Sequence, residues 1–165
     1  MRGKQAIKRK IRPDLRYGNT LISKFINYLM SDGKRTVAER VLYDSFDAIQ
    51  KQIEQGKIKK DDYPDALSVF DQAIKNVSPL MEVRGKRIGG GNYQIPFPVR
   101  GERKYFLAMH WLINAARGKK GRPMAQKLAD EFISAINNEG EAIKKKQDVH
   151  RMADANRAFA HFARF

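Results

Sequence analysis

The sequence predicts a mainly α-helical protein of about six helices, with a protruding two-stranded β-ribbon between the third and fourth helices. Apolar residues recur at helical spacing in six segments, as in helices that bury one face. The period changes to two within residues 81–99, as in strands. The chain has 165 residues, 42% of them hydrophobic, which is enough for one core. We therefore expect a single domain over residues 1–165.

The first half of the chain predicts three helices. Apolar side chains repeat over residues 21–30, and Gly33 is placed to end that helix in a left-handed cap. A longer helix follows over residues 37–53, with Val37 on its buried stripe, and should pair antiparallel with the first. The third helix should carry Pro64 in its first turn, where a missing N–H is tolerated.

The ribbon is predicted over residues 81–99. Apolar or small residues alternate with charged ones, and the alternation resumes after the glycines at 89–91. These glycines tolerate positive φ angles, so we expect the turn there rather than at Gly85. Pro96 and Pro98 should then stop the second strand.

Three more helices complete the prediction. The fourth should cover residues 103–117, the fifth should run from Pro123 to Gly140, and the last should cover residues 148–161 with Met152 on its inner face. Four phenylalanines fall on buried positions of the helical patterns and are assigned to the core: Phe25, Phe46, Phe70 and Phe132.

The charge of the chain favours a polyanionic partner. The 33 Lys and Arg residues exceed the 18 Asp and Glu residues and give a formal net charge of +15. Residues 1–12 are basic with few apolar groups, so we expect a flexible arm that becomes ordered on a partner. Residues 44–71 hold seven acidic residues against four basic ones and should face away from the polyanion.

The sequence favours a soluble protein of a reducing compartment. The absence of cysteine removes disulfides and thiolate sites. The longest apolar stretch, residues 105–116, is interrupted by His110 and Asn114 and is too short to span a membrane. The basic start has no apolar run of the kind that a secretory signal needs. We expect no membrane partner.

Catalytic patterns have little support in the sequence. His110, His150 and His161 are far apart and form no zinc motif, so we expect no metal. The adjacent Asp61 and Asp62 precede a helix and should cap it rather than act as an acid–base pair.

Nucleotide binding is not supported either. The glycines at 89–91 precede a predicted strand rather than a helix. The sequence GKRT at 33–36 is close to a P-loop ending, but Tyr28 stands where the earlier glycine is required. We therefore expect no enzyme activity, no cofactor and no small-molecule substrate.

Four separated basic segments could together wrap a folded RNA through backbone contacts. They are the arm, the ribbon, the loop at 117–122 and the lysines at 144–146. Each segment alone is also typical of an ordinary solvated surface, so the prediction depends on the set.

The ribbon taken alone admits two interpretations with equal weight. Arg84, Lys86 and Arg87 on its first strand can bind phosphates, or they can protect an exposed strand edge from aggregation. Tyr93 can stack on a base or pack onto the helical body, and we favour packing.

Three long ordered motifs resemble one family, small-subunit ribosomal protein seven in its bacterial or organellar form. The first is LISKFINYLM at 21–30 with DGKR at 32–35. The second combines NVSP at 76–79, MEVR at 81–84, the glycines at 89–90 and YQIP at 93–96. The third combines KKK at 144–146, DVHRMA at 148–153, AN at 155–156 and AFAH at 158–161. The resemblance extends from end to end of the chain.

The resemblance implies a structural constituent of the small ribosomal subunit. A protein of this family is expected to be a primary binder of the small-subunit ribosomal RNA that nucleates assembly of the subunit head, near the decoding region. Its implied partners are that RNA, exit-site transfer RNA and neighbouring small-subunit proteins. The implied location is the ribosome, in a bacterial cytoplasm rather than an organelle.

Two sets of residues carry these expectations. Those expected to contact ribosomal RNA are Lys8, Arg9, Lys10, Arg12, Lys34, Arg35, Arg84, Lys86, Arg87, Arg117, Lys119, Lys120, Lys144, Lys145, Lys146, Arg151, Asn156 and Arg157. Those expected near transfer RNA are Arg84, Gly89 and Gly90. The alternatives are an RNA-processing enzyme, which would need a catalytic site, and a nucleoid-type DNA-binding protein, which the charge alone would allow.

Overall fold

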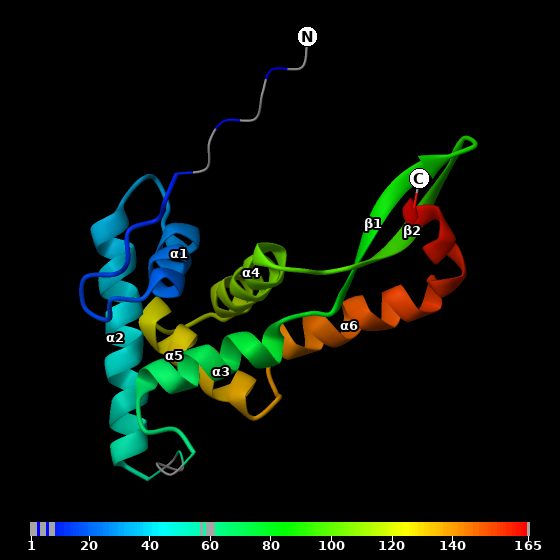
Figure 1. Ribbon diagram of the computed structural model, residues 1–165. Coiled ribbons are helices and arrows are strands. Elements are labelled where there is room, and N and C mark those ends of the chain that lie inside the picture. Colours follow the sequence, from blue (N-terminus) through cyan, green and yellow to red (C-terminus); the bar gives the residue numbers. More distant parts are fainter. Residues whose placement is uncertain (1–2, 4–5, 7–8, 57, 59–61, 165) are drawn as a thin grey trace. The chain divides into compact units, whose positions relative to one another are not determined.

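The computed structural model of the chain describes residues 3, 6, 9–56, 58 and 62–164. Contacts group the chain into two compact units, Met1–Arg40 and Val41–Phe165. The described part is mainly helical, with an antiparallel hairpin between the third and fourth helices, as predicted (Figure 1). In chain order the elements are α1 (Thr20–Leu29), α2 (Arg35–Glu54), α3 (Ala66–Val77), β1 (Met81–Ile88), β2 (Gly91–Pro98), α4 (Glu102–Gly118), α5 (Met124–Ile136), α6 (Glu141–Ala155) and the 3₁₀-helix η1 (Arg157–Arg164).

The first unit contains α1 and the beginning of α2. Asn19 starts α1 because its side-chain oxygen accepts a 2.8 Å hydrogen bond from a backbone N–H of the first turn. The helix ends at Leu29, four residues before Gly33, so the predicted glycine cap is wrong. Met30 leaves the helical region at ψ 138°, and Asp32 and Gly33, with φ angles of 53° and 72°, form the turn toward α2 instead.

The core of the second unit is centred on three phenylalanines from three helices. Phe46 on α2, Phe70 on α3 and Phe132 on α5 have ring centroids 5.5 to 6.4 Å apart and no solvent exposure. Edge-to-face pairs of this kind add to the free energy gained from burying the rings. The prediction that they form the core is confirmed, and Phe25 of the first unit is also fully buried.

Two residues predicted on buried faces are exposed instead. Val37 is 53% exposed and Met152 is 47% exposed. Val37 stands in the first turn of α2 and Met152 in the last turn of α6. The apolar stripe of a helix can continue into its terminal turns, although the elements packed against the helix do not cover those turns.

The start of α3 also differs from its prediction. Asp65 is the N-cap, and its backbone N–H donates to Ser68 Oγ at 3.4 Å. Asp62 therefore does not cap this helix, and Asp61 lies outside the described residues. Pro64 precedes the helix by two positions rather than standing in its first turn.

The last predicted helix is wrong in both of its bounds. It begins at Glu141, seven residues before the predicted position, and ends at Ala155, after which the chain tightens into η1. The apolar residues of its first turns, Ala142 and Ile143, are buried. They are followed at once by the lysines at 144–146, so the helical period is interrupted in the sequence.

The hairpin has the turn that the glycines predicted. β1 pairs with β2 so that Ile88 faces Gly91, and Gly89 and Gly90 make the turn with φ angles of 56° and 88°. Pro96 does not stop the second strand, because that strand continues to Pro98. In a two-stranded ribbon each strand has an open edge, where a missing N–H costs no ladder hydrogen bond.

The 3₁₀-helix η1 packs on the hairpin. Tyr93 of β2 lies 5.2 Å from Phe159 and 6.1 Å from Phe162, measured between ring centroids. Tyr93 was expected to pack onto the helical body, and it packs onto the C-terminal segment instead. The ring also lies over Gly91, where an added Cβ would come within 3.0 Å of it. Figure 1 shows η1 alongside the strands.

Candidate nucleic-acid interface

The cations of the hairpin are divided between its two faces. Because side chains alternate along a strand, Arg84 and Lys86 share one face of β1 and Arg87 points to the other. Arg84 and Arg87 are exposed, and Lys86 is half-buried on the face where its pairing partner Tyr93 contacts η1. The hairpin therefore offers cations in two directions.

A buried carboxylate lies at the base of the hairpin. Glu82 is only 5% exposed, and both of its oxygens carry an ion pair. Oε1 pairs with Arg84, and Oε2 accepts from Arg103 Nε of α4 at 3.0 Å. The guanidinium of Arg84 also lies over Phe97 at 5.1 Å, and that of Arg103 over Phe106 at 4.9 Å.

Arg103 is a candidate RNA contact that the sequence prediction missed. In the sequence, this residue marked only the predicted start of the fourth helix. The available signal was Glu82, an acid at a strand position that turns out to be buried. A buried carboxylate needs a cationic or hydrogen-bonding partner. That requirement predicts an arginine or lysine nearby, but it does not say which one.

The cations of α6 have different environments. Lys144, Lys145, Arg151 and Arg157 are exposed, and Lys144 and Lys145 line a hollow of about 420 Å³ together with Trp111. Arg151 pairs with Asp148 at 3.2 Å, a surface contact that leaves most of its side chain in solvent.

Lys146 also makes a structural contact within the protein. Its Nζ donates to the backbone oxygen of Asn76 at 2.6 Å, at the end of α3. Burial lowers the pKa of Lys146 below its usual value, and repulsion from Lys104 lowers it further. The side-chain amide of Asn156 donates to the oxygen of Met152 at 2.8 Å. These two predicted contact residues therefore already have partners in the free protein.

The loop after α4 is likewise mixed. Arg117 and Lys120 are exposed. Lys119 lies 2.6 Å from Glu131, which is fully buried, so its charge is neutralised within the protein. Arg122 pairs with Asp130 at 3.0 Å. Arg117 and Lys120 are thus the exposed predicted contacts of this loop.

In the first unit, Arg9, Lys10, Arg12 and Lys34 are exposed, while Lys8 lies outside the described residues. Arg35 is held by three neighbours: it contacts Glu39 at 2.7 Å, Asn27 at 3.2 Å and Ser23 at 3.2 Å. Its guanidinium joins the start of α2 to α1 within this unit. Arg35 is therefore a structural residue as well as a predicted contact.

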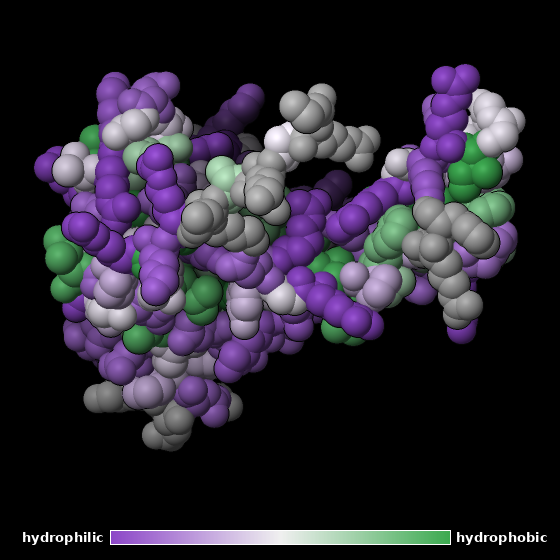
Figure 2. Space-filling view, turned by 45° about the horizontal axis from the view of Figure 1, so that its top comes forward, coloured by the Kyte–Doolittle hydropathy of each residue, from purple (hydrophilic) through white to green (hydrophobic). Residues whose placement is uncertain are grey.

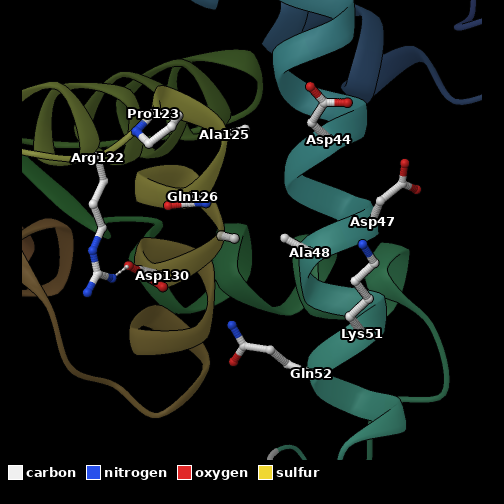
Figure 3. Close-up of a pocket in the computed structure, with 11 residues that line it drawn as sticks. Asp44, Asp47, Ala48, Lys51, Gln52, Arg122, Pro123, Ala125, Gln126 and Asp130 are labelled. Atoms are coloured by element: carbon white, nitrogen blue, oxygen red, sulfur yellow. Dashed lines mark hydrogen bonds and ion pairs between the residues drawn. The ribbon is translucent and has the colours of Figure 1, made fainter.

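A groove of about 650 Å³ lies between α2 and α5 (Figure 3). Asp44, Asp47 and Lys51 line it from α2, and Arg122 and Asp130 border it on the other side. The groove is lined by three acidic residues, Asp44, Asp47 and Asp130, and by the two basic residues Lys51 and Arg122. Hydrophilic residues cover most of the face seen in Figure 2, with hydrophobic ones scattered among them.

Within the described residues, no cluster of three or more His, Cys, Asp or Glu side chains could hold a metal ion. No helix in the same part of the chain is long and apolar enough to cross a membrane.

The protein has a mainly helical body, a basic hairpin and further exposed cations on a loop and on α6. These features are typical of the class of proteins that bind a polyanion. The comparisons identify the class further. Residues 1–157 match the family described as ribosomal protein S7p/S5e. The chain therefore belongs to this ribosomal protein family, whose members are structural rather than catalytic.

Curated relatives agree over nearly the whole length. The small ribosomal subunit protein uS7 of Thermotoga maritima is 52% identical over 162 residues, covering 98% of this chain and 99% of that protein. The proteins of the same name from Thermosipho africanus and Chloroflexus aggregans are 51% and 49% identical. The Chloroflexus match covers 95% of this chain and 94% of its own length. The resemblance and the expectation that the protein is not an enzyme are confirmed.

Proposed function

We propose that this protein is a primary ribosomal RNA-binding protein that nucleates assembly of the small-subunit head. The whole chain acts as one RNA-binding domain, with residues 1–12 as its arm. The observation that carries the proposal is the set of exposed cations on separate elements of a +15 chain that belongs to a small-subunit ribosomal family. Separate cations let one protein contact distant parts of a folded RNA.

The proposed mechanism is assembly without chemistry. The folded helices present cations at fixed positions, and the arm becomes ordered when it meets the RNA. Each phosphate that is neutralised releases condensed counterions, which supplies much of the affinity. If about six to ten phosphates are contacted, log affinity falls against log salt with a slope of roughly −5 to −9.

The proposed contacts are those expected from the family resemblance. Arg87, Lys120 and Lys145 are exposed, which supports them as phosphate contacts. Lys119 and Lys146 are weaker candidates, because their ammonium groups have partners inside the protein. The hairpin tip at Gly89 and Gly90 is proposed to lie near exit-site transfer RNA, and both glycines are exposed.

The proposed setting is the ribosome of a bacterial cytoplasm, beside neighbouring small-subunit proteins. The bacterial relatives support this setting. The acidic groove between α2 and α5 is proposed to face away from the RNA.

The test is binding of the purified full-length protein to transcribed small-subunit ribosomal RNA at several salt concentrations. Tight binding with the steep salt slope is expected, and an affinity that does not change with salt would contradict the mechanism. End-labelled RNA in the same reactions should stay intact, whereas strand scission would favour an RNA-processing enzyme.

The other candidate is a nucleoid-type DNA-binding protein, which the net charge alone favours. Competition between duplex DNA and the folded ribosomal RNA separates the two functions. We expect the RNA to win by a large factor, and equal affinity for the two would overturn the ribosomal proposal.

A further inference from the structure

The base of the hairpin carries two arginines held by one carboxylate. Glu82 uses Oε1 for Arg84 and Oε2 for Arg103, so the two guanidinium groups lie on the two sides of a single buried group. Arg84 comes from β1 and Arg103 from the first turn of α4. The hairpin and the helix thus share one charged centre.

We propose that Glu82 positions Arg84 and Arg103 as a paired site for a backbone phosphate of RNA. The inference deepens the proposed function, because it rests on RNA binding and adds Arg103 as a contact and Glu82 as a positioning residue.

The arginines are oriented but still accessible. Each guanidinium is fixed on one side by Glu82 and on a flat face by an aromatic ring, Phe97 for Arg84 and Phe106 for Arg103. Their side chains are nevertheless 55% and 47% exposed. A guanidinium has five N–H donors in a rigid fork, and the contact with Glu82 uses only part of them. The remaining donors can bind a phosphate in pairs, and their fixed direction lowers the entropy cost of binding.

The local charge also favours an anion. Two arginines face one carboxylate, which leaves an excess of one positive charge. Lys104 follows Arg103, and it lies close enough to Lys146 for its charge to oppose protonation there. A phosphate bound by Arg84 and Arg103 would compensate this excess charge.

The experiment separates the effect of the protein's net charge from the effect of how the two guanidinium groups are positioned. Glu82→Gln adds one unit of positive charge to the protein, so a non-specific electrostatic effect would tighten RNA binding. Loss of the positioning carboxylate should instead weaken binding about fivefold, because Arg84 and Arg103 are then held less firmly and their charge-assisted hydrogen bonds to the phosphate weaken. Arg103→Lys keeps the charge but loses the planar fork, and should weaken binding about tenfold.

Arg40→Lys is the matched control, because Arg40 is also an exposed arginine but belongs to none of the four basic segments. Full-length proteins are titrated with transcribed small-subunit ribosomal RNA, and thermal unfolding verifies that each variant is folded. Phosphate ethylation interference on the same RNA identifies the phosphate involved. The same one or two positions should lose interference in both E82Q and R103K, and stay unchanged in R40K.

The outcomes separate the two proposals. If the wild-type protein does not bind the RNA, the proposed function fails. If the wild type binds and both E82Q and R103K bind as tightly with an unchanged interference pattern, RNA binding stands and the paired site is overturned. Tighter binding by E82Q also overturns the site, because it would mean that charge alone matters at Glu82.

Discussion

Lys119 Nζ lies 2.6 Å from Oε2 of Glu131, whose carboxylate has no exposure to solvent. The other oxygen of Glu131 accepts from the backbone N–H of Ala142, at the start of α6, at 3.0 Å. One side chain of α5 thereby joins the loop after α4 to the first turn of α6. Gly140 must lack a side chain here, because an added Cβ would come 2.9 Å from Oε1.

Lys119→Met should destabilise the fold strongly, because it leaves the Glu131 charge buried and unpaired. The expected loss is about 3 kcal/mol in the free energy of unfolding. Urea unfolding followed by circular dichroism measures it. Lys120→Met, one residue along and exposed, is the control and should change stability by less than about 0.5 kcal/mol. Equal stability of the two variants would contradict the role assigned to the ion pair.

Phe70→Ala should remove the centre of the core in the second unit. Phe70 contacts both Phe46 and Phe132 at centroid distances of 5.5 and 5.6 Å, so truncation leaves a cavity. The expected cost is about 3 to 5 kcal/mol, measured by denaturant unfolding. Tyr105→Ala, at a side chain that is 39% exposed, should cost far less.

Stability should fall at mildly acidic pH through His150. Leu80 N–H donates to His150 Nε2 at 3.0 Å, which requires a neutral ring. Burial lowers the pKa of His150 below its usual value of 6.5, the charge of Lys146 lowers it further, and Asp154 opposes the change. The unfolded chain then binds the proton more readily than the folded one. The stabilising contribution is therefore complete above pH 6.5 and is lost as the pH falls below that value.

The measurement is the free energy of unfolding between about pH 8 and pH 5 for the wild type and for His150→Gln. The variant should lose less stability over this range, and the wild type should lose at most about 1.4 kcal/mol per pH unit from this one proton. Parallel pH profiles for the two proteins would rule out His150 as the responsible group.

Gly91→Ala should loosen η1 from the hairpin. The new Cβ would stand 3.0 Å from the Tyr93 ring and push it from Phe159. We expect faster tryptic cleavage after Arg157 with little change in far-ultraviolet circular dichroism. Gly85→Ala is the matched control on β1, where the nearest atom lies at 3.6 Å and belongs to a side chain. Equal cleavage rates would argue against docking of η1 through Tyr93.

Arg84→Ala combined with Arg87→Ala should weaken RNA binding while leaving the helical body folded, because both side chains are exposed and the buried Glu82 keeps Arg103 as its partner. Each lost phosphate contact should make the salt slope smaller by about one. Filter binding at several salt concentrations gives the slope, and circular dichroism gives the helix content. A loss of helical signal would instead make these arginines structural.

Helical spacing and the change to period two were sufficient to predict the order of the elements and the turn of the hairpin. They failed where one pattern interrupts another. The lysines at 144–146 concealed the beginning of α6, and Gly33 was assigned to a helix end although it serves the following turn. The residue at which a helix ends depends on local backbone conformation, which the spacing of apolar residues does not determine.

The candidate site was predicted less completely. Exposed cations such as Arg87 and Lys145 were found from charge alone. The pairing of Arg103 with Glu82 joins positions 21 residues apart, and the pairing of Lys119 with Glu131 separates a structural lysine from its neighbours. Such distinctions arise only when helices and strands pack, so no linear pattern contains them.

The contact between η1 and β2 has a mechanical consequence. A ribbon of two strands alone bends readily, since it has little material on either side of its plane. The rings of Phe159 and Phe162 thicken it on the face of Tyr93, whereas Arg87 and Asn92 on the opposite face are exposed. The hairpin is therefore supported by η1 on one face only. It should yield more easily in one direction than in the other when a neighbour presses against its tip.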